Sequence, residues 1–281
     1  METAPVLSLV GTLLKSFKNT RKSVPSQSEL MGAKPVTRQG VIHFTDRHLE
    51  RFNQAIEWKG QAIPPTYPYA LATVLQFEIV NDSDFPFSPY GLLHKSEKIE
   101  VLHPLTRPRS KGDWQMVCKI ERYTEVKRGY EFELKSELMI AGKLCWKSTT
   151  TAFKRGNTTD SSERKKGEPV DTSSGRPWSF HAGLGRVYGV LSKNLDPIHV
   201  SGLTAKLLGH PAAIIHGMYT LARGLSEVPN LSAPVTIETR FFSPIFLPAK
   251  ICFVQEVGGF KVVSSSGAKT HIQVAITPSQ G

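Results

Sequence analysis

The sequence predicts an α+β fold in which one unit, a central helix wrapped by an antiparallel sheet, occurs twice. Two observations support this prediction. Each half of the chain runs from helix-like segments to four segments with the alternation typical of β-strands. Each half also contains a helix-like segment that is apolar nearly all round, and such a helix must be enclosed by its own domain. A curled, mostly antiparallel sheet provides that enclosure in a two-layer domain.

The composition of the chain predicts four segments. Residues 1–40 are a leader or a docked amphipathic segment, 41–153 the first unit, 154–176 a linker and 177–281 the second unit. The first segment has apolar residues at helical spacing and few acids, which fits either an organelle transit peptide or an amphipathic helix. The linker is rich in Ser, Thr and Gly and has almost no large apolar residue, so we expect it to be exposed.

In the first unit a helix is expected behind the cap residue Thr45, ending near Gly60. Three prolines follow within residues 61–69 and exclude regular structure there. A buried apolar helix is then expected over residues 69–80. Strands are expected over residues 92–101, 114–123, 130–141 and 144–153.

The second unit repeats this order after the linker. A helix is expected over residues 184–192, followed by a proline-containing loop and by apolar helices within residues 201–225. One pair of matched segments is visible by eye, KIEVLHPL at residues 98–105 and RFFSPIFLP at residues 240–248. Strands are expected over residues 235–242, 249–257, 260–265 and 271–277.

Charge and cysteine content restrict the class of partner. The 281 residues carry a net charge of +11 with a pI near 9.6, which indicates an anionic partner. The basic residues are scattered and no RNA-binding or zinc-finger pattern accompanies them, so phosphates of a small cofactor fit better than nucleic acid. No apolar run approaches the ~20 residues of a membrane span. Three distant cysteines favour an intracellular protein without disulfides or structural zinc.

The residues that can carry chemistry gather in residues 188–222. Asn194, Asp196 and His199 lie on a loop that leads into a helix, and Pro197 excludes Asp196 from helical geometry. His199 is a candidate general acid or base, and Asp196 or Asn194 can orient its ring or hold a water.

A second histidine, His216, stands beside Gly217, whose bare backbone N–H can approach a carbonyl oxygen at the start of a helix. Such a donor stabilises a developing enolate by roughly 3 kcal/mol in other enzymes. The structural alternative is that the histidines are ordinary packed residues and that Asp-Pro is a turn. Three further histidines lack such neighbours and are expected to be structural: His94, His103 and His181.

The run SKNLDPIHVSGLTAKLLGHPAAIIHGM, residues 192–218, resembles the MaoC-like (R)-specific enoyl-thioester hydratases, whose motif has the form SGDxNPxH followed by a short helix, a proline-containing loop and HGM. In the first half, PPTYPYALA and DFPFSPYGLLH resemble the double-hotdog (3R)-hydroxyacyl-thioester dehydratases of bacterial fatty-acid metabolism. The resemblance covers most of the chain. It implies a double hotdog, two tandem units that each wrap a sheet around a central helix.

The resemblance also implies which half is catalytic. The second hotdog carries the active residues in that family, and here Pro65-Thr66-Tyr67-Pro68 is expected to stand in the first half where Pro197-Ile198-His199 stands in the second. The implied catalytic residues are His199, Asn194 and Asp196, and the implied substrate-binding residues are Gly217, His216 and Met218. The first half then lines the acyl pocket.

In the same way the resemblance implies an acyl thioester of CoA or of acyl-carrier protein as substrate. No metal or redox cofactor is required. The protein is expected to be a pseudo-dimeric monomer or a homodimer, in the cytoplasm or the mitochondrion.

The chain departs from the family motif at three positions. Asn194 stands where the family has Asp, Asp196 where it has Asn, and Lys193 where it has Gly. An asparagine positions a water but accepts no proton from it. Two functions therefore follow from the resemblance: a hydro-lyase that interconverts trans-2-enoyl and (3R)-3-hydroxyacyl thioesters, or a pseudoenzyme that binds acyl thioesters without converting them. Thioesterase activity is a third, less favoured alternative.

Overall fold

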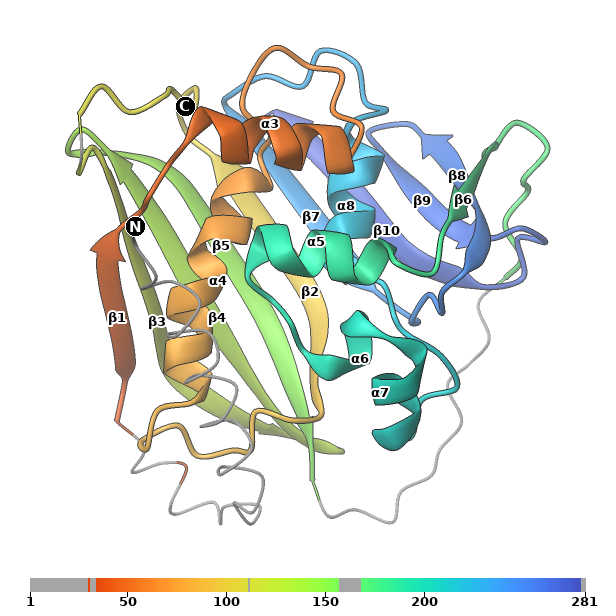
Figure 1. The fold of residues 1–281 in the computed structure, drawn as a ribbon, viewed down its shortest axis with the longest axis horizontal. Coiled ribbons are helices and arrows are strands. Elements are labelled where there is room, and N and C mark those ends of the chain that lie inside the picture. Colours follow the sequence, from red (N-terminus) through yellow and green to blue (C-terminus); the bar gives the residue numbers. More distant parts are fainter. Residues whose placement is uncertain (1–29, 31–33, 111, 157–167, 279–281) are drawn as a thin grey trace.

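The structure, a computed structural model, describes residues 30, 34–110, 112–156 and 168–278, in which helices cover one face of a single long sheet (Figure 1). The first half contains β1 (Val36–Val41), α3 (Asp46–Ala55), α4 (Tyr67–Val80), β2 (Leu92–Val101), β3 (Trp114–Val126), β4 (Gly129–Ile140) and β5 (Lys143–Arg155). The second half contains β6 (Arg176–Phe180), α5 (Leu184–Ser192), α6 (Pro197–Val200), α7 (Gly202–Leu207), α8 (Gly217–Leu225), β7 (Val235–Phe241), β8 (Ala249–Glu256), β9 (Gly259–Ser264) and β10 (Thr270–Pro278).

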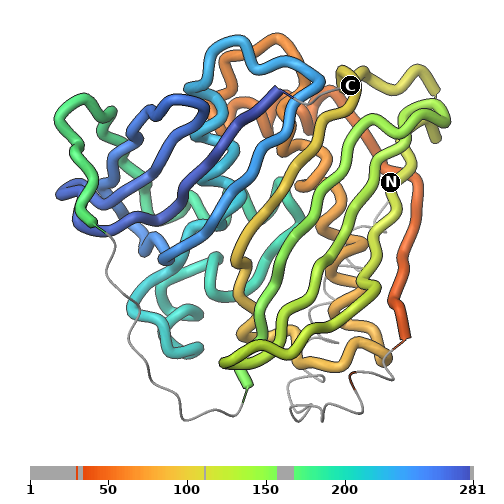
Figure 2. The backbone as a smooth tube through the Cα atoms, turned by 180° about the vertical axis from the view of Figure 1, so that it is seen from behind, coloured from red at the N-terminus to blue at the C-terminus, as the bar shows by residue number. Residues whose placement is uncertain are grey.

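The strand order shows the duplication directly. The ten-stranded sheet runs β1-β3-β4-β5-β2-β7-β10-β9-β8-β6. From the middle of the sheet to either edge, the strands of the two halves follow in equivalent order, β2-β5-β4-β3-β1 in the first half and β7-β10-β9-β8-β6 in the second. The two halves join where β2 pairs with β7 in antiparallel register, from Ser96 opposite Arg240 to Val101 opposite Val235. Figure 2 shows these two strands side by side in the middle of the sheet. The predicted α+β double hotdog is therefore confirmed, and part of the matched segments at 98–105 and 240–248 lies in this seam.

Most predicted strands and helices are present, but two strands were missed. Val36–Val41, which the sequence placed within the N-terminal segment, is strand β1 and pairs with β3. Arg176–Phe180, which starts at the last residue of the predicted linker, is strand β6 and pairs with β8. Both are short edge strands with Gly, Pro or charged residues, which weaken an alternating pattern. The predicted N-terminal amphipathic helix lies outside the described residues, as does the linker from 157 to 167.

The expected correspondence between Pro65-Thr66-Tyr67-Pro68 and Pro197-Ile198-His199 is wrong. In element order α3 matches α5 and the long helix α4 matches α8, so Thr66 and Tyr67 correspond to His216 and Gly217. Thr66 is the N-cap residue of α4 just as His216 is the N-cap residue of α8. The segment with α6 and α7 has no counterpart in the first half. The first half therefore lacks the histidine because it lacks the whole inserted segment.

The two halves also meet through their helices. His48 of α3 bonds Tyr67 of α4, with 3.0 Å between Nδ1 and the hydroxyl oxygen. Its Nε2 donates to the backbone oxygen of Leu191 in α5 at 2.9 Å. One imidazole thus joins three helices across the halves. Within the described residues, no helix is both long and apolar enough to pass through a membrane.

Candidate active site

The loop between α5 and α6 is shaped by backbone and side-chain hydrogen bonds. The side-chain oxygen of Asn194 accepts from the backbone N–H of Asp196 at 3.2 Å. Asp196 is the N-cap residue of α6, and its carboxylate accepts from the N–H of Ile198 at 3.1 Å. Such side chains stabilise turns and helix starts because they satisfy donors that the helix cannot. The loop therefore holds Asp196 and His199 at the two ends of one helical turn.

His199 is fixed in one tautomer by its neighbour in the chain segment before α8. Its Nδ1 lies 2.7 Å from the backbone oxygen of Ile214, which can only accept, so Nδ1 carries the hydrogen. Nε2 then carries the lone pair and is the basic nitrogen of the neutral ring. The backbone N–H of Ile214 in turn donates to the oxygen of Ile198 at 2.9 Å. Helix α6 and the segment before α8 thus each donate a hydrogen bond to the other.

Burial lowers the pKa of His199 below its ordinary 6.5, while the negative charge of Asp196 and the Ile214 carbonyl oppose this shift. The acidic group that acts electrostatically on His199 is therefore Asp196. Asn194 instead holds the second histidine in place: its backbone oxygen accepts a hydrogen bond from Nε2 of His216 at 3.1 Å. The structure thus distinguishes the two exchanged residues: the acid at position 196 acts on the histidine through its charge, and the amide at position 194 supports the loop.

His216 packs directly on His199, with ring centroids 3.7 Å apart and an interplanar angle of 28°. Burial, and next the nearby His199, lower the pKa of His216 well below 6.5, so His216 is neutral at pH 7. Its Nδ1 is buried and has no hydrogen-bond partner among the described residues. Because His216 directly precedes Gly217, this stack places the His199 imidazole beside the start of α8.

Gly217 is the first residue of α8, where helical N–H groups have no partner within the helix. A Cβ atom at this position would lie 2.7 Å from the Phe241 ring, so only glycine fits there. The N-terminus of the helix also carries a positive partial charge. It can therefore receive a carbonyl oxygen and stabilise negative charge on it. Met218 is buried in the core, with 4% of its surface exposed.

Helix α5 lets the segment that carries His199 approach closely. A Cβ atom on Gly185 would lie 2.3 Å from the backbone oxygen of His199. Replacing this glycine therefore requires His199 to move. The sequence contains this glycine, but its role depends on the tertiary contact and no local pattern indicates it.

A residue of the first half also reaches the site. Tyr90 lies in the loop between α4 and β2, which passes below α6 in Figure 1. Partial burial raises the pKa of its phenol, and the charge of Asp196 adds to this rise. Lys154 of β5 holds the loop by donating to the backbone oxygens of Ser88, at 3.3 Å, and Tyr90. Tyr90 belongs to the SPYGLLH run, and the influence of Asp196 on it could not be seen in the sequence.

Comparisons with known proteins agree with this arrangement. Residues 161–277 match the MaoC like domain. Over 224 residues the chain is 26% identical to 3-hydroxyacyl-thioester dehydratase X of Mycobacterium tuberculosis (strain ATCC 25618 / H37Rv), a match that covers 78% of this chain and 79% of that protein. The second half of the chain therefore carries a MaoC like domain. The matched residues of the domain include Asn194, Asp196, His199, His216 and Gly217.

Solved structures of this MaoC-like fold extend over both halves. A crystal structure of HtdX from Mycobacterium tuberculosis matches with a TM-score of 0.72 at 23% identity. The match covers 87% of this chain and 100% of the HtdX chain. A MaoC-like dehydratase from Phytophthora capsici has a TM-score of 0.65 at 19% identity and covers 90% of this chain and 98% of its own. Peroxisomal multifunctional enzyme type 2 from Drosophila melanogaster has a TM-score of 0.58 at 16% identity, covering 99% of this chain and 53% of its own. At these identities the likeness is one of fold.

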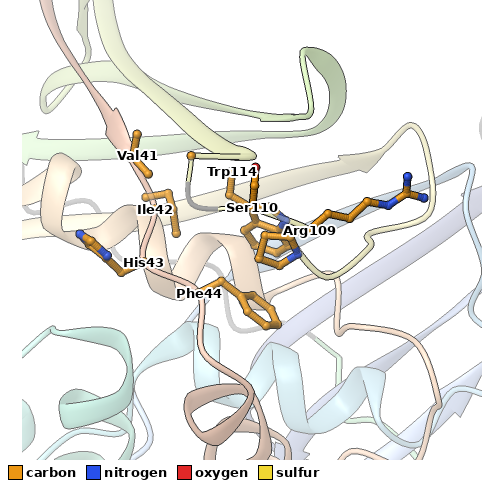
Figure 3. Close-up of a pocket in the computed structure, with 9 residues that line it drawn as sticks. Val41, Ile42, His43, Phe44, Arg109, Ser110 and Trp114 are labelled. Carbon is orange, nitrogen blue, oxygen red and sulfur yellow. The ribbon is translucent and has the colours of Figure 1, made fainter.

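A separate open pocket of about 310 Å³ lies between the β1–α3 connection and the β2–β3 loop. Figure 3 shows Phe44 and Trp114 among the side chains that line it, with the side chain of Arg109 extending away from them. None of the residues gathered around His199 lines it. Among the described residues, no cluster of three or more His, Cys, Asp or Glu side chains is arranged to hold a metal ion.

Proposed function

We propose that this MaoC-like protein is a hydro-lyase that interconverts trans-2-enoyl and (3R)-3-hydroxyacyl thioesters of CoA or acyl-carrier protein. The observation that supports this most is the joint placement of His199 and Gly217. The histidine has a free Nε2 lone pair, Asp196 provides negative charge nearby, and the N-terminus of α8 lies beside its ring. A proton carrier and an oxyanion donor are the two groups that hydration of an enoyl thioester requires.

In the proposed mechanism the thioester carbonyl accepts a hydrogen bond from the N–H of Gly217. Asp196 and His199 hold a water, and Nε2 of His199 takes a proton from it as the oxygen bonds to C3. The C2=C3 electron pair moves toward the carbonyl oxygen, where the helix N-terminus stabilises the enolate. His199 then gives its proton to C2, and the enolate returns to the thioester. Dehydration follows the same steps in reverse.

This assignment gives Asp196 the role that the family motif gives to the acid at position 194. Asn194 is a positioning residue for the loop. It takes part through its hydrogen bonds to Asp196 and His216 and transfers no proton. His216 supports the His199 ring, and Met218 anchors the first turn of α8 in the core.

The alternative is a protein that binds acyl thioesters without converting them. The observation that favours it is the Asp196 carboxylate, which also caps α6 by accepting from Ile198. A carboxylate occupied in this way holds a water less strongly. Under this alternative, exchanging both residues, Asn194→Asp with Asp196→Asn, creates hydration activity that the wild-type protein lacks.

The deciding experiment is hydration of a medium-chain trans-2-enoyl-CoA by the wild-type protein and by His199→Ala. The hydro-lyase predicts turnover that falls by ~10²–10⁴-fold in the variant, the usual contribution of a general acid–base group. His181→Ala, at an exposed histidine outside the site, is the matched control. Equal rates in wild type and His199→Ala remove His199 from the mechanism. Release of free CoA thiol instead of hydration indicates a thioesterase.

The carrier and compartment belong to this proposal as well. The positive net charge of +11 suits the phosphates of CoA or of a carrier protein. The three cysteines are buried free thiols, which supports an intracellular location, in the cytoplasm or the mitochondrion. The pseudo-dimeric sheet allows one chain to supply a whole site, and a homodimer of such chains remains compatible with it.

A further inference from the structure

The first half contributes a second histidine–carboxylate pair close to the site, His94 and Glu97 on β2. Nε2 of His94 lies 3.0 Å from a carboxylate oxygen of Glu97, whose side chain is completely buried at 0% exposure. Ser148 and Thr150 of β5 also donate to this carboxylate, at 2.5 and 2.6 Å. Burying a carboxylate costs free energy unless it is hydrogen-bonded, and this one accepts three bonds.

A β-bulge produces the pair. The register of β2 against β5 shifts between His94, opposite Ala152, and Ser96, opposite Thr151. In a regular strand, residues three apart point to opposite faces of the sheet. The extra residue turns His94 and Glu97 to the same face, the one that packs on the helices. This bulge explains why the sequence predicted only a structural role for His94.

His94 borders the oxyanion site. Its ring packs on Phe241 with centroids 4.5 Å apart, and Phe241 is the side chain that closes against Gly217. On the other side it lies parallel to Tyr69 of α4, at 6.2 Å and 17°. The short stretch from Tyr90 to His94 therefore runs from the neighbourhood of Asp196 to the neighbourhood of Gly217. This stretch therefore lies close to the two residues, His199 and Gly217, that are proposed to hold the thioester.

The contact with Glu97 leaves one nitrogen of His94 for a ligand. Because a carboxylate accepts, Nε2 carries the hydrogen, and in the neutral ring Nδ1 then presents its lone pair. No described residue hydrogen-bonds Nδ1, and 26% of the side chain is exposed. A plain alkyl chain that covers this nitrogen excludes water from it and offers no hydrogen bond to replace the water. Binding sites that leave a polar group unpaired in this way discriminate strongly against the ligand that does so.

We infer that His94, oriented by Glu97, is a specificity-determining residue that selects acyl chains with a hydrogen-bond donor, such as a hydroxyl group, near the thioester over plain alkyl chains. The inference rests on the proposed function, since it names the class of acyl group that the same site accepts. A hydroxyl group donates to Nδ1 of His94. The first half thereby decides which acyl chain reaches the catalytic half.

The test compares trans-2-hexenoyl-CoA with its 4-, 5- and 6-hydroxy derivatives. We expect wild-type kcat/KM to favour at least one hydroxylated chain by ~10–100-fold, the effect of one satisfied against one unsatisfied hydrogen bond. His94→Phe keeps the ring contacts with Phe241 and Tyr69 but removes Nδ1, so the preference should disappear. Glu97→Gln removes the charge and leaves one acceptor oxygen where Ser148, Thr150 and His94 now share two, so it should weaken the preference. His43→Phe, the same change at an exposed histidine, should keep it.

An equal preference in wild type, His94→Phe and Glu97→Gln overturns the inference, as does the absence of any preference in the wild type. Binding of the saturated hexanoyl-CoA and hydroxyhexanoyl-CoA, measured by calorimetry, separates this result from failure of the proposed function. A binding preference that His94→Phe abolishes, without turnover of any chain, sustains the inference and rejects the hydro-lyase. Turnover of all the enoyl-CoA chains with no preference for a hydroxylated one sustains the hydro-lyase and rejects the inference.

Discussion

The imidazole rings of His199 and His216 lie stacked with their centroids 3.7 Å apart, and burial lowers the pKa of both. Two protonated rings at this separation would repel each other, so the stack favours the neutral forms. The site is thus built around an uncharged His199 whose Nε2 is ready to take a proton. Its dependence on pH follows from this state.

Hydration activity should fall in acid as His199 becomes protonated. Because burial lowers the pKa of His199 below 6.5, kcat/KM should stay constant above pH 7 and decline as the pH falls through this lowered pKa. The charge of Asp196 raises the pKa of His199. Asp196→Asn should therefore move the acid limb to lower pH while reducing the plateau. A pH–rate profile of both proteins measures this, and a limb that stays in place contradicts the role of Asp196.

The stability of the fold should also fall in mild acid. His48, His199, His216 and His271 all have a lowered pKa in the folded protein, mainly through burial. Between the lowered and the ordinary pKa the unfolded chain binds more protons, so the free energy of unfolding rises with pH. This stability is present above pH 6.5 and is lost as the pH falls through the folded values.

Urea unfolding at pH 7.5, 6.5 and 5.5 measures the effect. His48→Gln should be less stable than the wild type at pH 7.5 and should show a smaller loss between pH 6.5 and 5.5, because one of the four groups no longer titrates. This interval lies above the ordinary range of carboxyl groups, so they contribute little. A stability that is constant from pH 7.5 to 5.5 would falsify the assignment of neutral histidines.

Gly185→Ala should impair catalysis by displacing His199. The added Cβ atom meets the backbone oxygen of His199 at 2.3 Å, so the loop must shift. A displacement of about 1 Å in a catalytic group can reduce the rate by ~10²-fold. Gly202→Ala is the matched control, since a Cβ atom there meets nothing within 4 Å. Steady-state kinetics should show a lower kcat for the first variant only, and equal kcat values would contradict the proposed packing.

Lys193→Gly should stabilise the protein. Lys193 ends α5 with φ at 57°, in the left-handed region that disfavours side chains and favours glycine. Relief of this strain should raise the free energy of unfolding by about 1 kcal/mol. Lys206→Gly in α7 should lower it by a similar amount, because the residue has ordinary helical geometry there. Thermal or urea unfolding distinguishes the two, and a loss of stability in Lys193→Gly would count against the strain.

The regular part of the fold could be predicted because long amphipathic patterns depend on local sequence. Strand β2 was predicted over the residues that it occupies, and the helix α5 likewise. Strand β6 was missed because five residues with a proline show no clear alternation. The apolar stretch predicted as helices over 201–225 is interrupted between α7 and α8, where Gly209 adopts φ at 85° and Pro211 follows. The helices expected there are therefore α7 and α8, separated by these local breakers.

The candidate site was predictable only where its residues are close in sequence. Asp196, His199 and Gly217 come from one run and could be found together. Tyr90 and His94 reach the same place from the other half through pairing of β2 with β7, a contact between residues more than a hundred positions apart. No local pattern reports such a contact, and the bulge after His94 conceals which face its side chain occupies.

The seam between β2 and β7 has a consequence for how the protein behaves in dilute solution. Two separate hotdog subunits would come apart when their concentration fell below the dissociation constant of the dimer. Here both partners belong to one polypeptide, so their effective concentration is set by the connecting chain. Specific activity should therefore be independent of enzyme concentration, and Tyr90 and His94 of the first half always accompany the same His199.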